Sequence, residues 1–461
     1  MAGWTELLAC VIAAFFFYKW FKFYRLRVKL AHIPTLGSDS FLWSYLDAWR
    51  FISKGHTLIE DGYAKYKGQP FKVACHTTQS GWLVVVNDPN MIEDMRKASP
   101  EVLSFRGAAI DLVQTKYTSP RNFKATPFHV PVVRSPLTKA FPTRFARCCG
   151  RDQGQRISTD WTPFPLYQTL THVVCRTTNR LFVDLPLLLA KSKDCGPSRL
   201  EPQPTFFAIT PNWLKPVVGP LMPCHALERR AKRILARLIQ VRLAKHAAHG
   251  TNWEGPVMFT NFLSIHTTAL VRPLPMVGAF FSLADHRSST QTSTDTLFDL
   301  AARPEYIAPL RAEIDEAIAC HGWTKDALAR LVKLDSFMKE SGRFGGNAAM
   351  AMRRRACQDF AFSNGVVIPQ DVTVCVARRP MQLDSDHYED PLEFKGFRFA
   401  ELREKEGAGL ESLQHQMVSL DPTYMLFGYG RNACPGRFFA VNEVKVLLAH
   451  IIRELRLEAP R

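Results

Sequence analysis

The stretch FGYGRNACPG, residues 427–436, places Cys434 between glycines and directly before an apolar segment with helical spacing. Glycines have no Cβ and allow a flat, bulky group to approach the backbone closely. The N-terminus of the following helix, together with backbone N–H groups turned toward the sulfur, favours the thiolate over the thiol. A strongly donating thiolate is one of the axial ligands of haem iron and promotes O–O bond cleavage. The plainer alternative is an ordinary buried cysteine in a glycine-rich turn.

Two further motifs precede this loop in the chain. In Glu340-Ser341-Gly342-Arg343 the charged residues are spaced i,i+3, which puts them on one face of a helix. Farther along, Arg398 stands in Phe397-Arg398-Phe399, after Pro391 and Phe394. Taken alone, the first motif is common and is more often a surface ion pair. All three motifs in this order make a chance match improbable.

Together the motifs resemble those of cytochromes P450, whose haem loop reads Phe-x-x-Gly-x-x-x-Cys-x-Gly. The resemblance covers nearly the whole chain and implies a mainly α fold with small β-sheets that binds haem b, with Cys434 as the axial iron ligand. It also implies that Arg398 completes a buried network with Glu340 and Arg343. Asn432 departs from the family, which usually has His or Arg at this position to contact a haem propionate. The implied cofactor-binding residues of the loop are Phe427, Gly430, Arg431, Asn432 and Gly436.

A finer resemblance, to fungal microsomal members near the ent-kaurene oxidase-like group, rests on residues 174–180, 265–268, 335–340 and 433–440. It implies that Thr267 helps to deliver protons to bound oxygen. His266 stands where many members carry an acid. The alternative for the threonine is a hydroxyl bonded back to its own helix. The implied activity is that of a monooxygenase that inserts one atom of O2 into an apolar, terpenoid-like secondary metabolite.

The resemblance implies partners as well. Electrons come from NADPH-cytochrome P450 reductase, with cytochrome b5 as an optional second donor, and a basic surface near Cys434 suits docking of an acidic reductase. Three rival interpretations stay open. One is a non-catalytic product that does not hold haem, and another is a haem-thiolate isomerase or peroxygenase that needs no reductase. The third is a basic nucleic-acid or membrane-surface binder, which would show salt-sensitive binding without haem.

Residues 1–30 are a candidate membrane anchor. The unbroken apolar stretch Leu7–Tyr18 has 12 residues, fewer than the roughly 20 that span a bilayer. Snorkelling lysines and interfacial aromatic residues extend the usable segment to Trp4–Tyr24. Because the basic residues lie on its C-terminal side, we expect the body of the protein to lie in the cytosol. The resemblance to microsomal members implies that the membrane is that of the endoplasmic reticulum. An amphipathic helix lying in the interface is the alternative.

Length and composition fit one large globular domain, residues 31–461. The chain has 461 residues and a net charge of +17, but its basic residues are scattered, Arg353–Arg355 among them, and accompany no nucleic-acid-binding motif. We therefore interpret them as solvated faces and expect no nucleic-acid partner. The 11 cysteines contain no CxxC pair, which argues against a disulfide scaffold or a zinc ribbon. The patterns predict a sheet at 71–86, β-structure at 366–376, a turn at 33–37, and helices at 227–247, 303–320, 333–340 and 437–443.

Residues 271–291, VRPLPMVGAFFSLADHRSSTQ, interrupt a helical pattern. Pro273 and Pro275 lie within it, and a proline inside a helix costs about 3 kcal/mol. Deleting these 21 residues restores a continuous helix and keeps the reading frame, so we interpret them as a translated, unspliced intron. A genuine loop insertion is the alternative. Segments 143–159 and 190–204 also look foreign to the family, and we expect the C-terminal strands that close the substrate pocket to be truncated.

Overall fold

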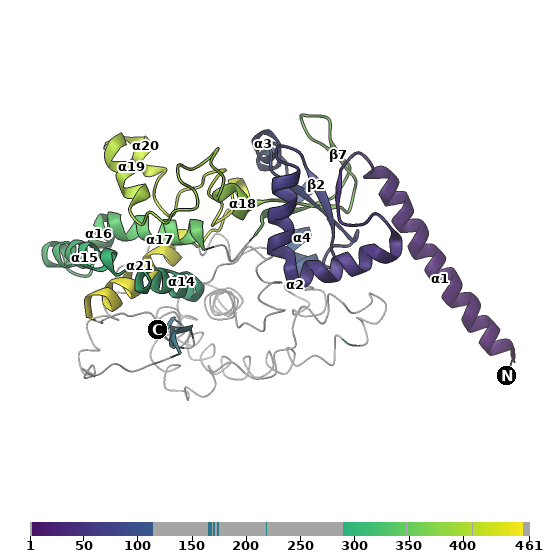
Figure 1. Ribbon diagram of the computed structural model, residues 1–461, viewed down its shortest axis with the longest axis horizontal. Helices are drawn as coiled ribbons and strands as arrows, with labels where there is room; N and C mark the ends of the chain where they lie inside the picture. The colour runs from purple at the N-terminus through teal and green to yellow at the C-terminus, as the bar shows by residue number, and fades with distance from the viewer. Residues whose placement is uncertain are drawn as a thin grey trace, which may run out of the picture.

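Two hydrophobic cores organise the part of the chain that the computed structural model describes (Figure 1). One core surrounds a six-stranded sheet, and the other fills a group of helices from the C-terminal half. The described residues are 2–113, 165–167, 169–170, 173–174, 218, 289–345, 349–407 and 409–454.

The sheet joins segments that lie far apart in the sequence. β3 (Trp82–Val86) pairs antiparallel with β2 (Phe71–Ala74) and parallel with β8 (Thr373–Val376). Every residue of these three strands is buried, which explains why β3 is an uninterrupted apolar run. The strand order is β1-β2-β3-β8-β5-β4. The remaining strands of this sheet are β1 (Thr35–Leu36), β4 (Leu103–Ser104) and β5 (Ala351–Ala356).

Left-handed backbone shapes both the hairpin before β3 and the strand β5. Gly81 has a φ of +80° directly before β3, in the hairpin predicted at 71–86. In β5 the register against β8 shifts between Ala351 and Arg354, and Met352 between them has a φ of +51°. A bulge of this kind bends a strand and re-aims a side chain. A second, two-stranded sheet pairs β6 (Phe360–Ala361) with β7 (Val367–Ile368).

The helical core is built around α17 (Val332–Phe344), which is buried continuously from Leu334 to Arg343. α14 (Ser289–Ala301) packs against α17 and against α21 (Arg437–Glu454), the helix that follows the cysteine loop. The neighbouring elements are η6 (Pro304–Tyr306), α15 (Ile307–His321), α16 (Lys325–Arg330), α19 (Arg398–Glu406) and α20 (Leu410–Leu413).

The N-terminal helix α1 (Ala2–Lys29) projects from the body of the protein (Figure 1). α2 (Phe41–Lys65) begins beside the end of α1 and has non-helical backbone at Lys54, where it kinks. The short helices around the sheet are α3 (Pro89–Lys97), α4 (Phe105–Val113) and α18 (Arg378–Gln382).

The described structure confirms the mainly helical class, the hairpin at 71–86 and the helix predicted at 333–340. The helix predicted at 303–320 is split into η6 and α15, and the turn predicted at 33–37 contains β1, which pairs with β2. Of the suspected insert, Ser289, Thr290 and Gln291 lie in α14. The predictions that fall outside the described residues are the remainder of that insert, the helix at 227–247 and the segments 143–159 and 190–204.

Candidate active site

The cysteine loop folds back on itself just before α21. The backbone N–H of Cys434 donates to the carbonyl of Phe427 at 2.8 Å, and that of Ala433 donates to the carbonyl of Gly430 at 3.1 Å. Gly428 and Gly430 both have a φ of +74°, a left-handed conformation that favours glycine. The loop, with η7 (Gly430–Asn432) at its tip, therefore closes around a cysteine that is half-buried and in no disulfide.

Helix α3 packs against η7 at the tip of this loop. A Cβ added to Gly430 would lie only 2.5 Å from Cγ of Arg96. The Arg96 guanidinium is held by two hydrogen bonds to Glu93 and lies 5.9 Å from the centroid of the Tyr429 ring. The same hydrogen bonds lower the pKa of Glu93. Glycine is thus required at position 430 both by the backbone conformation and by the arginine packed against it.

Arg437 fixes the start of α21 next to the cysteine. Its Nε donates to the carbonyl of Val418 at 3.0 Å, and its Nη1 donates to the carbonyl of Cys434 at 3.2 Å. The carbonyl of Gly436 accepts the first backbone bond of the helix, from Ala440. The partial positive charge of a helix N-terminus therefore lies within one turn of the cysteine, an environment that favours a thiolate.

Glu340, Arg343 and Arg398 form one buried network. Glu340 accepts from Nε and Nη2 of Arg343 at 2.7 and 2.8 Å, and from Nε of Arg398 at 3.3 Å. The side chains of Glu340 and Arg343 are completely buried, so this is not the surface ion pair that the isolated motif would suggest. The other donors of the two arginines bond to the carbonyls of Gln382, Glu389, Asp390, Pro391 and Glu393.

The network helix α17 contacts the segment that leads into the cysteine loop. A Cβ on Gly342 would lie 2.7 Å from the Tyr424 hydroxyl and 3.3 Å from Leu426. On its other side, Ser341 donates to the Asp299 carboxylate at 2.6 Å and so links α17 to α14. α17 therefore sets the position of both the loop and the helix that faces α21.

Arg353, in the bulge of β5, is a residue that sequence reasoning did not single out. It is 7% exposed, and its Nε and Nη2 have no hydrogen-bond partner among the described residues. Burying two guanidinium nitrogens without acceptors is unfavourable, so these two atoms fit an anionic ligand such as a haem propionate. The interpretation as a solvated basic face is wrong for Arg353 and Arg354, because the sheet covers both. Because side chains alternate between the two faces of a strand, consecutive arginines in a predicted strand cannot all lie on one solvated face. This alternation was the sequence signal that could have indicated a buried arginine.

The threonine site predicted for proton delivery, Thr267 with His266, lies outside the described residues. α14 itself carries buried hydroxyls that bond back to their own helix, for example Thr294 to the carbonyl of Thr290 at 2.7 Å. Of the loop residues predicted to bind the cofactor, Arg431 and Asn432 are exposed in η7. Phe427, Gly430 and Gly436 are half-buried.

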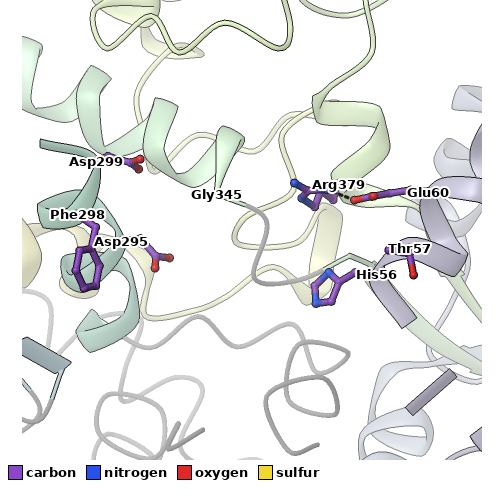
Figure 2. Close-up of a pocket in the computed structure, with 8 residues that line it drawn as sticks. All are labelled: His56, Thr57, Glu60, Asp295, Phe298, Asp299, Gly345 and Arg379. Atoms are coloured by element: carbon purple, nitrogen blue, oxygen red, sulfur yellow. Dashed lines mark hydrogen bonds and ion pairs between the residues drawn. The ribbon is translucent and has the colours of Figure 1, made fainter. Parts of the chain in front are cut away.

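A hollow of about 500 Å³ opens between α2, α14 and α18 (Figure 2). An ion pair between Arg379 and Glu60 crosses one wall, and burial together with Arg379 lowers the pKa of His56. None of the described site residues predicted from the sequence lines it, so it is separate from the cysteine loop. Its described lining consists of His56, Thr57, Glu60, Asp295, Phe298, Asp299, Gly345 and Arg379.

Comparison with known proteins identifies the family. The family description Cytochrome P450 matches residues 277–461. Cytochrome P450 monooxygenase 103 of Postia placenta is 36% identical over 443 residues, which cover 92% of this chain and 87% of that protein. Cytochrome P450 monooxygenase 151 of the same fungus is 33% identical and covers 96% and 90%. The crystal structure of the cytochrome P450DA haem domain matches with a TM-score of 0.56 at 16% identity, over 91% of this chain and 90% of that one, and shows the fold alone.

The helical fold with a cysteine loop at the start of a long helix defines a haem-thiolate oxidoreductase. The chain belongs to the cytochrome P450 family and is a fungal-type monooxygenase, a family that uses haem with a cysteine thiolate as axial ligand. Its membership of the ent-kaurene oxidase-like group stays a prediction.

Proposed function

We propose that Cys434 is the thiolate ligand of the haem and that the enzyme oxidises an apolar, terpenoid-like secondary metabolite. The observation that carries the assignment of the cysteine is the closed loop, in which the Cys434 N–H bonds to the Phe427 carbonyl beside the start of α21. The substrate class rests on the sequence resemblance.

When bound, haem with a thiolate ligand activates O2, so that one oxygen atom enters a C–H bond of the substrate. Cys434 would hold the iron, and the start of α21 favours the charged form of this cysteine. The Glu340 network holds the loop in place through α17, as the close approach of Gly342 to Tyr424 indicates. Glycine at 428 and 430 gives the loop the left-handed turns that bring its backbone close to a flat ligand.

Arg353 is the residue we assign to a haem propionate. Two of its nitrogens are buried without a partner in the part of the chain that the structure describes, and the bulge at Met352 turns the strand at this point. Arg431 and Asn432 are the second candidates for contact with a haem propionate, because both are exposed in η7. Thr267 with His266 is proposed to move protons toward bound oxygen, by resemblance alone.

The proposed electron donor is NADPH-cytochrome P450 reductase, with cytochrome b5 as a second donor. Exposed cations close to the cysteine loop support docking of an acidic partner, among them Lys97 on α3 and Arg431 on η7. We propose that α1 anchors the protein in the endoplasmic reticulum membrane and leaves the catalytic domain on the cytosolic side. Its candidate span, Thr5–Lys29, has a mean hydropathy of 1.5.

The carbon monoxide difference spectrum of the reduced protein tests the cysteine assignment. We expect a red-shifted Soret band from the chain as written, its loss in Cys434→Ser, and its retention in Cys320→Ser. Cys320 lies on α15 and is exposed, so it is a matched control. A band that persists in Cys434→Ser would show that another residue binds the iron.

A second arm of this experiment deletes residues 271–291. A band only in the shortened protein would show that the segment prevents haem binding and would support the intron interpretation. No band in either protein would favour the non-catalytic rival. Product formation without NADPH and reductase would favour the peroxygenase or isomerase rival.

A further inference from the structure

The segment that leads into Cys434 is attached to both hydrophobic cores. Met425 is buried in the core around the sheet, and the half-buried ring of Tyr429 packs against the same core. Leu426 is buried in the helical core, and Phe427 packs against that core. The cysteine loop therefore lies at the boundary between the sheet and the helices.

Helix α3 belongs to the sheet side of this boundary. Its apolar residues Met91, Ile92 and Met95 are buried in the core around the sheet. Figure 1 shows α3 beside the strands, whereas α21, the helix that follows the cysteine, lies among the helices on the other side. A contact between α3 and the loop thus connects the two sides.

Polar contacts also hold α3 in place. The Asp88 carboxylate accepts from the backbone N–H groups of Asn90 and Met91 at 2.7 and 3.0 Å, as in a helix N-cap. Asp94 accepts from the N–H and the hydroxyl of Ser363 at 2.8 and 2.7 Å. Because these bonds and the buried apolar residues fix the helix, the rest of α3 is a firm support for the residues that pack on it.

Arg96 connects α3 to the loop. Its Nε and Nη2 donate to Glu93 at 2.6 and 2.5 Å, and its guanidinium lies 5.9 Å from the centroid of the Tyr429 ring. A paired guanidinium of this kind is held in one orientation, and a cation near an aromatic ring is attracted to it. The same side chain lies against Gly430, the next residue of the loop. We call Glu93, Arg96 and Tyr429 the α3 clamp.

The two residues proposed to contact the haem come from opposite sides of the boundary. Cys434 precedes α21 of the helical core, whereas Arg353 lies in β5 of the sheet. If the loop were attached to the helices alone, the position of Cys434 relative to Arg353 would depend only on the packing of distant elements. The α3 clamp connects the loop to the sheet side directly.

We propose that Tyr429, held by Arg96 and Glu93, is a positioning residue that fixes Cys434 relative to the sheet and to Arg353. The inference rests on the proposed function, in which Cys434 binds the haem iron. The Glu340 network supports the loop from the helical side, and the α3 clamp is its second support, from the sheet side.

Hydrogen–deuterium exchange on the full-length chain, before haem is added, tests the clamp without the cofactor. The Cys434 N–H bonds to the Phe427 carbonyl, so its exchange reports opening of the loop. We expect Tyr429→Ala to speed this exchange about tenfold, which corresponds to about 1.4 kcal/mol of closed-loop stability. Tyr429→Phe keeps the ring and should restore the wild-type rate.

Tyr66 offers a matched control on the same core. It is half-buried, packs against the core around the sheet, and has the Lys65 Nζ 5.0 Å from its ring centroid. Since Tyr66 lies outside the loop, Tyr66→Ala should leave the exchange of the Cys434 N–H unchanged. Equal acceleration in Tyr66→Ala and Tyr429→Ala would overturn the proposal, because the loss of any ring from this core would then be sufficient.

A variant pair on α3 tests the ion pair. Lys97 also pairs with Glu93, at 3.5 Å, but its side chain is 66% exposed. Glu93→Gln should speed the exchange less than Tyr429→Ala, and Lys97→Gln should not change it. In the double variant the effects of Glu93→Gln and Tyr429→Ala should not add, because both remove the same contact. Fully additive effects would overturn the clamp.

The same variants are then loaded with haem, reduced and treated with carbon monoxide. In mild urea, Tyr429→Ala should lose the red-shifted Soret band faster than Tyr66→Ala, and Tyr429→Phe should retain it. Faster exchange with an unchanged band would overturn the positioning role. Faster exchange in a protein whose wild type shows no red-shifted band would support the clamp and count against the proposed function. Unchanged exchange in Tyr429→Ala would overturn the proposal whatever the spectrum.

Discussion

Arg343 and Arg353 are both buried, but their surroundings differ. Arg343 is completely buried, and its donors are bonded to Glu340 and to backbone carbonyls. Arg353 is 7% exposed, and two of its nitrogens have no partner among the described residues. Since burying charged nitrogens without acceptors is costly, the first arrangement serves the fold, and we propose that the second binds an anionic ligand.

The two arginines differ in a way that distinguishes charged residues that stabilise the fold from charged residues that bind a cofactor. A residue whose hydrogen bonds are all made within the chain should destabilise the fold when it is removed. Substitution of a buried residue whose donors lack acceptors within the chain should instead weaken ligand retention and leave the chain folded. The same substitution at both positions is therefore a direct test.

Arg343→Met should have the largest effect. It leaves the Glu340 carboxylate buried without its main partner, and breaking a buried pair in this way costs about 3–5 kcal/mol. We expect a large loss of soluble protein and a strongly lowered free energy of unfolding in urea. A variant as stable as the wild-type chain would contradict the structural role of the network.

Arg353→Met should leave the free energy of unfolding of the haem-free chain unchanged or slightly raised, because a buried cation with two nitrogens that lack acceptors is replaced by an apolar side chain. Transfer of haem from the variant to an acceptor protein should be about tenfold faster. This is the size of effect that follows the loss of a residue that hydrogen-bonds to the ligands of a bound metal. Arg353→Lys should restore part of the retention. The comparison fails if Arg353→Met unfolds the chain as Arg343→Met does.

Gly430→Ala should have an intermediate effect. Left-handed backbone costs a residue with a Cβ about 1–2 kcal/mol, and the new Cβ meets Arg96. We expect a weakened red-shifted Soret band with little change in far-UV circular dichroism. Adding Arg96→Ala should recover the steric part alone. Full recovery by Arg96→Ala would show that backbone strain contributes nothing.

Lys339 is a third buried cation, and it should give the smallest effect. It donates to the carbonyl of Gln414 at 3.2 Å and lies 4.3 Å from the Phe399 ring centroid. Burial lowers the pKa of Lys339 to about 8 from 10.5. Because the unfolded chain binds more protons between these values, this group makes the folded state more stable as the pH rises from about 8 toward 10.5. Urea unfolding at about pH 7.5 and about pH 9.5 should show that relative gain in the wild type and not in Lys339→Met.

Local patterns predicted the residues that act through local geometry. The i,i+3 spacing of Glu340 and Arg343 predicted a shared helix face, and the structure brings the two side chains within hydrogen-bond distance. Arg398 lies 58 residues away from Glu340 in the sequence, so no local spacing relates the two. Only the family resemblance brought it into the network.

The burial of Arg353 and the exposure of large apolar side chains such as Leu42 and Trp43 on α2 could not be predicted in this way. Strand alternation separates two faces, but it does not say that β5 lies inside a sheet between β8 and β4. Similarly, the apolar residues of α2 are spread around the helix, and only its packing on β2 shows which of them stay uncovered.

The sequence by itself determined the cysteine loop, the helix that follows it and the charged motif on α17, because turns and helices depend on neighbours within a few residues. The tertiary structure decided which charges are satisfied, that Arg96 backs Gly430, and which face of α2 meets solvent. These properties depend on contacts between segments far apart in the chain, and a contact of this kind exists only once the sheet and the helical core have formed.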